Sequence, residues 1–151
     1  MIVSTHQINE HGKELVQSAF VLSSIEFATG TDADTDFVVF SRRYQRPLTV
    51  KVTANKKPKP AGGVGRPHLD WWVPDDSATD VFALVDLQSR RIWLVEASEV
   101  AAVAQQHPEG RFHVCMATDP QVQPRRDGKR IYDYEFEDYL FQNSARKLFC
   151  Q

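Results

Sequence analysis

The chain has 151 residues, of which 42% are hydrophobic and 25% charged, and its formal net charge is -2. This length supports one well-packed core and is short for two, so we expect a single domain over residues 1–151. No apolar run approaches the length of a membrane-spanning helix, and the first residues lack the basic region and apolar stretch of a secretory signal. We therefore expect a cytoplasmic protein with no membrane contact.

Helical spacing of apolar residues predicts a first helix over residues 5–24, with Ser4 or Thr5 as its cap. The apolar stripe of this helix comprises Ile8, Gly12, Leu15, Val16, Ala19 and Leu22. A short strand is predicted at 24–28, and an acidic turn leads from it to a strand at 37–40. A basic turn then leads to a strand at 48–54, in which Lys51 shares a face with Thr49.

The sequence from residue 55 onward predicts a longer series of short helices, strands and loops. Prolines, glycines and lysines over 55–67 indicate a flexible loop. The later elements are an extended segment at 69–74, a hairpin of strands 81–85 and 91–95, a helix at 98–106, a strand at 111–116, a basic loop at 118–128 and a helix at 133–149.

Two smaller features of the sequence give limited predictions. Trp71 and Trp72 are adjacent, so in an extended segment only one ring can join the core, and the other is a base-stacking, interface or loop-covering candidate. Cys115 and Cys150 show no zinc-ligand spacing, and we expect both to be reduced thiols.

Basic residues gather in a window without acids. No Asp or Glu lies between Phe37 and Leu69, whereas eight of the 18 lysines and arginines do. Such a window suits the phosphates of a nucleic acid, although a solvated tether explains its loop equally well. The candidate nucleic-acid contacts are Arg42, Arg43, Lys56, Lys57, Lys59 and Arg66.

An aspartate and a lysine occupy neighbouring strands of the predicted hairpin. Asp36 opens the first strand, and Lys51 lies within the second. A carboxylate that holds Mg²⁺ beside an ammonium that orients water or phosphate suits the metal-assisted hydrolysis of phosphodiesters. A structural ion pair between the two residues gives the same pattern.

The order of these elements resembles the PD-(D/E)XK nuclease-like superfamily over roughly residues 10–105. The resemblance implies an α/β restriction-endonuclease-like fold, a mixed β-sheet flanked by α-helices, with Mg²⁺ as cofactor and DNA as partner. It also implies that Asp36 binds the metal, that Lys51 is the catalytic lysine, and that Glu14 is a further catalytic residue on the first helix. Glu14 lies off the apolar stripe of that helix, so simple solvation explains its position as well.

One position departs from the family pattern. The second carboxylate of the family, two residues before the lysine, is Thr49 here, and a neutral hydroxyl is a weak Mg²⁺ ligand. Asp32, Asp34 or Glu26 could supply the missing oxygen. Two functions therefore remain: a Mg²⁺-dependent DNA endonuclease, and an inactive nuclease-fold module that binds nucleic acid or forms a homodimer.

Overall fold

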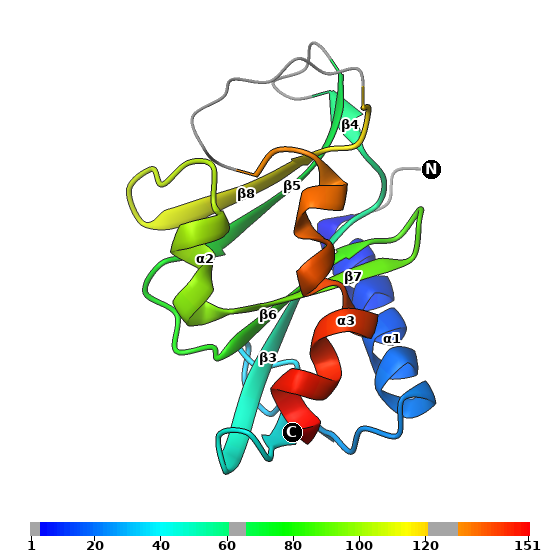
Figure 1. The fold of residues 1–151 in the computed structure, drawn as a ribbon, viewed down its shortest axis with the longest axis vertical. Helices are drawn as coiled ribbons and strands as arrows, with labels where there is room; N and C mark the ends of the chain where they lie inside the picture. The colour runs from blue at the N-terminus through cyan, green and yellow to red at the C-terminus, as the bar shows by residue number, and fades with distance from the viewer. Residues whose placement is uncertain (1–3, 61–65, 121–129) are drawn as a thin grey trace.

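The computed structural model describes residues 4–60, 66–120 and 130–151 (Figure 1). Its helical elements are α1 (Thr5–Leu22), α2 (Ala97–Val103), the 3₁₀ helix η2 (Asp133–Tyr139), α3 (Phe141–Ala145) and the π-helix η3 (Arg146–Cys150). Its strands are β1 (Ala28–Thr29), β2 (Phe37–Ser41), β3 (Arg46–Asn55), β4 (Lys59–Pro60), β5 (Pro67–Pro74), β6 (Val81–Asp86), β7 (Arg91–Glu96) and β8 (Arg111–Ala117).

The strands form two sheets. The main sheet has five strands in the order β1-β2-β3-β6-β7, with β3 and β6 parallel and the other neighbours antiparallel. The small sheet has the order β4-β5-β8 and is antiparallel throughout. The predicted α/β fold with a mixed sheet flanked by helices is confirmed, whereas the separate small sheet was not predicted.

Helix α1 begins where the sequence predicts it and packs against β3. The Ser4 hydroxyl accepts from the Gln7 amide, and the Gln7 side chain accepts from the Ser4 amide, which together form a capping box. A Cβ atom at Gly12 would lie 2.7 Å from the Ala54 side chain, so this glycine permits the close approach of helix and strand.

The predicted apolar stripe of α1 is wrong at its end. Leu22 is 86% exposed, whereas Phe20, which the stripe omitted, is fully buried. Gly12, Val16 and Phe20 recur at intervals of four residues and define the buried line, and Leu22 lies two residues beyond it on the opposite side of the helix.

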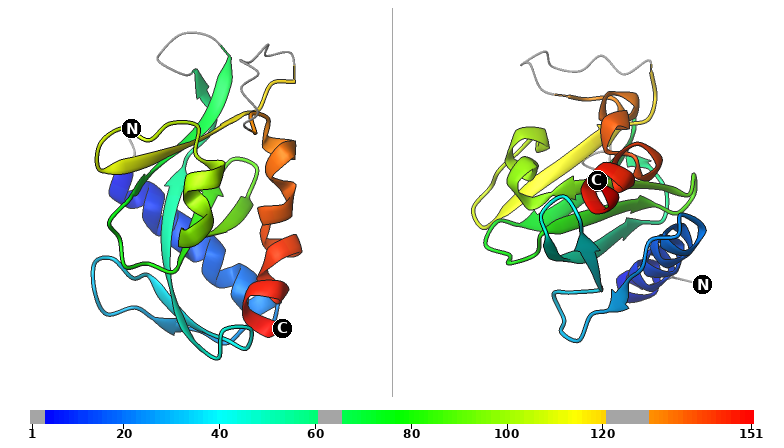
Figure 2. Two further views of the ribbon diagram at one scale, coloured as in Figure 1. Left: turned by 60° about the vertical axis from the view of Figure 1, so that its left-hand side comes forward. Right: turned by 60° about the horizontal axis from the view of Figure 1, so that its bottom comes forward.

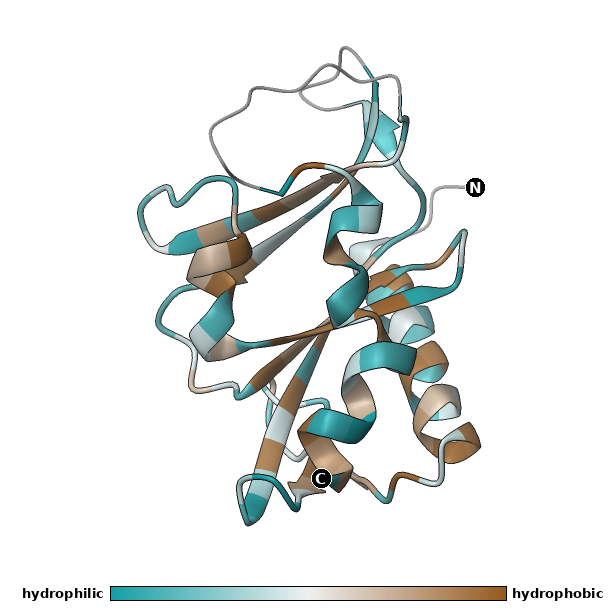
Figure 3. Ribbon diagram, viewed as in Figure 1, coloured by the Kyte–Doolittle hydropathy of each residue, from teal (hydrophilic) through white to brown (hydrophobic). Residues whose placement is uncertain are grey.

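The main sheet has a hydrophobic core on each face. Figures 1 and 2 show α1 on one side of this sheet and β8 with α2 on the other. One core combines residues of α1, β2, β3, α3 and η3, including Val16, Phe20 and Val50. The other lies toward the small sheet and includes Trp71 and Trp93. Figure 3 shows the apolar residues concentrated along the central strands and the polar residues at the turns between them.

The C-terminal segment is not the single helix predicted over 133–149. Leu140 has an extended ψ of 142° and forms a β-bridge with Trp93, so it separates η2 from α3. The predicted apolar character is confirmed, because Phe136 and Leu148 are both buried. Pairing with β7 has therefore overridden the helical periodicity at one residue.

The predicted loop over 55–67 contains a short strand. Lys59 and Pro60 pair with His68 and Pro67 and form β4, so the segment folds back as a hairpin, and residues 61–65 lie outside the described ranges. Most of the second predicted loop, 118–128, also lies outside them. Across the described ranges, no helix is both long enough and apolar enough to span a membrane.

Candidate functional site

The structure brings Asp36 and Lys51 together, as the hairpin register predicts. The Asp36 amide donates to the Val50 carbonyl at 2.8 Å and extends the pairing of β2 with β3. The Lys51 Nζ lies 3.8 Å from Asp36 Oδ2 and donates to the Ala33 carbonyl at 2.8 Å. Only 5% of the Asp36 side chain is exposed, so its carboxylate depends on these protein partners for solvation.

A second lysine, which the sequence analysis did not identify, contacts the same carboxylate. The Lys13 Nζ lies 3.1 Å from Asp36 Oδ1 and 2.8 Å from Glu10 Oε1. The Val52 amide donates to Asp36 Oδ2 at 2.7 Å. Both oxygens of Asp36 therefore have protein partners: two ammonium groups and one amide.

The pKa shifts of this cluster favour its charged form. The hydrogen bond to Glu10 raises the pKa of Lys13, burial opposes this, and Asp36 adds to the increase. The same contact with Lys13 lowers the pKa of Glu10 below its ordinary value. The two shifts thus favour the charged forms of the Glu10–Lys13 ion pair.

Glu14 and Asp32 line the same hollow as Glu10, Lys13 and Asp36 but form no ion pair with them. A hollow of about 290 Å³ is lined by Glu10, Lys13, Glu14, Asp32 and Asp36, among other residues. Glu14 is exposed and forms no ion pair with any residue that the structure describes. Four carboxylates thus face the hollow, but the described residues include no group of three acids, histidines or cysteines arranged to hold a metal ion.

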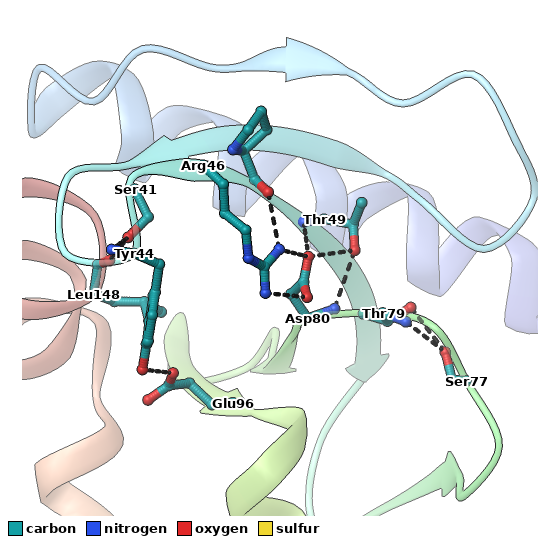
Figure 4. A network of polar contacts seen from close by, with 10 residues as sticks. Ser41, Tyr44, Arg46, Thr49, Ser77, Thr79, Asp80, Glu96 and Leu148 are labelled. Atoms are coloured by element: carbon teal, nitrogen blue, oxygen red, sulfur yellow. Dashed lines mark hydrogen bonds and ion pairs between the residues drawn. The ribbon is translucent and has the colours of Figure 1, made fainter.

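Thr49 is contacted by a carboxylate that the sequence analysis did not consider. Asp80 Oδ2 accepts from the Thr49 amide at 2.9 Å and from its hydroxyl at 3.2 Å, while the Asp80 amide donates back to the hydroxyl at 3.0 Å (Figure 4). The Arg46 guanidinium binds both carboxylate oxygens, at 3.1 and 3.2 Å. Parallel pairing of Val50 with Val81 sets this contact, because it places Asp80 beside Thr49.

The charge of Asp80 is stabilised by the same contacts. Burial alone raises the pKa of this carboxyl group, but the hydrogen bonds from Arg46 and Thr49 outweigh burial and lower the pKa below its ordinary value. The Thr49 hydroxyl therefore both donates to and accepts from a charged Asp80. Its hydrogen-bonding capacity is directed at Asp80 and not at Asp36.

The basic window of the sequence divides into two regions in space. Arg42 and Arg43 lie in the turn between β2 and β3, whereas the lysines of the β3–β5 connection lie beyond the opposite end of β3. Ten residues of β3 separate the two ends, which corresponds to about 30 Å. The window is therefore not one continuous surface.

The lysines at the far end, which we call the hairpin lysines, are Lys56, Lys57 and Lys59. All three are exposed, and none forms an ion pair with an acid in the part of the chain that the structure describes. Arg66, the fourth candidate at this end, lies 3.3 Å from Asp119 and is partly neutralised. The hairpin lysines are therefore the stronger phosphate-binding candidates of this region.

The two adjacent tryptophans separate as predicted. Trp71 is 1% exposed and joins the core, whereas Trp72 is 38% exposed. The His113 ring stacks on Trp72 at 4.0 Å, and the Arg111 guanidinium lies 4.0 Å from the centre of the Trp72 ring. The indole therefore already contacts an imidazole and a guanidinium, and a base that stacks where either of them lies would have to displace it.

No protein-family model matches this chain, and no curated protein matches it. The solved structure of a bacterial homing endonuclease, I-Ssp6803I, is similar with a TM-score of 0.54 over 97% of this chain and 98% of that one. The two sequences are 14% identical over this match. At that identity the likeness establishes a shared fold and nothing further about this chain.

Proposed function

We propose that this chain is a nucleic-acid-binding protein, a single PD-(D/E)XK-like domain that contacts DNA phosphates through the hairpin lysines without a bound metal. The observation that carries the proposal is the set of three exposed ammonium groups, none of which forms an ion pair with an acid in the described residues, on a chain that shares the fold of a nuclease. Unpaired lysines release counterions when they bind phosphate, and this release is the main source of sequence-independent affinity for DNA. Arg42 and Arg43, at the other end of β3, are proposed as a second contact.

The residues around Asp36 do not fit a Mg²⁺ ion in the arrangement described. Mg²⁺ requires oxygen ligands in near-octahedral geometry, usually with at least one free carboxylate. Both oxygens of Asp36 are engaged by Lys13, Lys51 and the Val52 amide, and the Thr49 hydroxyl is engaged by Asp80. We therefore assign Asp36 to the stability of the β2–β3 hairpin and assign phosphate binding to the hairpin lysines.

A second candidate function is Mg²⁺-dependent hydrolysis of DNA, with Asp36, Lys51 and Glu14 as the catalytic set. The observation in its favour is that Glu14 and Asp32 line the same hollow as Asp36. This function requires the Lys13 ammonium to leave Asp36, because it lies 3.1 Å from the carboxylate.

Homodimer formation, also predicted for a module of this kind, is checked by light scattering.

Replacing the hairpin lysines Lys56, Lys57 and Lys59 together by Gln should weaken binding to duplex DNA of any sequence. Each lost phosphate contact reduces the slope of log K against log salt concentration by about 0.9, so three contacts reduce it by about 2.7. Fluorescence anisotropy of a labelled duplex over a series of salt concentrations measures both quantities.

The matched control replaces Arg90, Arg146 and Lys147 by Gln. These residues are also exposed, and their loss changes the net charge by the same amount. We expect this control to retain most of the parent's affinity for the duplex and the same slope of log K against log salt concentration. Equal losses in the two triple variants would assign the binding to net charge and contradict a role for the hairpin lysines.

A further inference from the structure

We propose that Lys13 is a built-in cation, whose ammonium occupies the position between α1 and Asp36 that a divalent metal would otherwise take, and so excludes metal from this fold. The inference rests on the proposed function insofar as it explains why the protein binds nucleic acid without metal. It concerns a site that is separate from the hairpin lysines.

The contacts of Lys13 are those of a bound cation. Its Nζ lies 2.8 Å from Glu10 Oε1 and 3.1 Å from Asp36 Oδ1, and so bridges a helix carboxylate and a strand carboxylate. Bridging carboxylates from different elements is a usual role of a divalent ion at a protein site. Because Asp36 is 95% shielded from solvent, a further cation at its Oδ1 would meet the ammonium in a medium that screens charge weakly.

The fold holds Lys13 at this position by two local features. Gly12, the preceding residue, lets α1 approach β3 so closely that an added Cβ atom would lie 2.7 Å from Ala54. Glu10, three residues before Lys13 on the same helix, holds the ammonium from the other side. The lysine is therefore placed by helix packing and by an ion pair, and does not depend on Asp36 alone.

The hollow beside Asp36 becomes strongly acidic when Lys13 is removed. Among the described residues that line it, Lys13 is the only basic one, and the acidic ones are Glu10, Glu14, Asp32 and Asp36. Without the ammonium, four carboxylates face a space of about 290 Å³. Carboxylate oxygens are the preferred ligands of hard cations such as Mg²⁺ and Mn²⁺, so the position vacated between Glu10 and Asp36 offers two carboxylates to a divalent ion.

The test is a titration of Mn²⁺ into the purified chain without nucleic acid, followed by calorimetry and by the electron paramagnetic resonance signal of free Mn²⁺. The parent should show no saturable binding up to about 1 mM, the range of weak oxygen-ligand sites. Lys13→Met keeps an unbranched side chain that is one atom shorter and removes the charge, and we expect it to bind Mn²⁺ at least about tenfold more tightly than the parent. Lys13→Gln, with a polar end for the two carboxylates, provides the same test if Lys13→Met does not fold.

Three control variants separate this role from a general effect of charge. Lys13→Arg keeps the cation and should behave as the parent does. Lys51→Met removes the other ammonium from Asp36, but Lys51 does not line the hollow, so it should also bind no Mn²⁺. Glu10→Gln in the Lys13→Met background should weaken the new site.

The proposal would be overturned by saturable Mn²⁺ binding by the parent, or by equal Mn²⁺ binding by the Lys13→Met and Lys51→Met variants. Absence of any gain in both Lys13→Met and Lys13→Gln, each folded by circular dichroism, would overturn it as well. Because the titration contains no DNA, these results are independent of whether the hairpin lysines bind nucleic acid.

Discussion

Val39→Asp should leave the chain unfolded at room temperature. Val39 is 1% exposed and lies in the hydrophobic core that β2 shares with α1. An unpaired carboxylate in such a core costs several kcal/mol, against a total stability of about 5 to 15 kcal/mol for a domain. Far-ultraviolet circular dichroism during heating and urea titration measures the loss.

Phe40→Asp is the matched control for this substitution. Phe40 is the next residue of β2, points to the opposite face of the sheet and is 54% exposed. We expect its replacement to change stability by no more than about 0.5 kcal/mol. A folded Val39→Asp protein with a melting temperature like that of Phe40→Asp would contradict the assignment of the buried face of β2.

Asp36→Leu should destabilise the chain by about 2 to 4 kcal/mol. The carboxylate accepts from the buried Val52 amide at 2.7 Å and offsets the charges of Lys13 and Lys51. Its removal leaves that amide without an acceptor, and both ammonium groups lose the carboxylate that they share. Urea unfolding of the parent and the variant gives the difference.

Two variants separate the contributions to this loss. Asp36→Asn retains an oxygen for the Val52 amide, so we expect it to recover about half of the lost stability. Glu14→Gln changes an exposed carboxylate without an ion pair to any described residue, and should leave stability unchanged. If Asp36→Leu is instead more stable than the parent, the carboxylate is retained for a ligand and not for the fold.

Local patterns predicted the elements whose partners are close in sequence. The cap of α1 at Ser4, the β2–β3 hairpin and the β6–β7 hairpin are all confirmed, whereas the apolar stripe of α1 is correct only up to Ala19. The small sheet was not predicted, because the β6–β7 hairpin and α2 separate β5 from β8 in the sequence. Pairing at that range leaves no local signal. The break at Leu140 was missed for the same reason, since its partner Trp93 lies far away in the chain.

At the candidate site too, the contact set by a local hairpin was predicted, and the contacts set by tertiary packing were not. Asp36 and Lys51 were paired correctly because a short turn fixes the register of their strands. Lys13 and Asp80 were missed, since the first depends on how α1 packs at Gly12 and the second on parallel pairing with β6. Both reach their partners through tertiary contacts that no spacing in the sequence indicates.

Nucleic-acid binding without a metal is tested most directly with the parent protein at low salt. Binding to a labelled duplex is measured in a chelator and again in Mg²⁺ at matched ionic strength, and the recovered DNA is examined on a denaturing gel. We predict binding in the chelator at least as tight as in Mg²⁺, because Mg²⁺ competes for phosphates, and intact DNA in both samples. Binding that requires Mg²⁺, cleavage of the duplex in Mg²⁺, or no binding at low salt in either sample would contradict the claim.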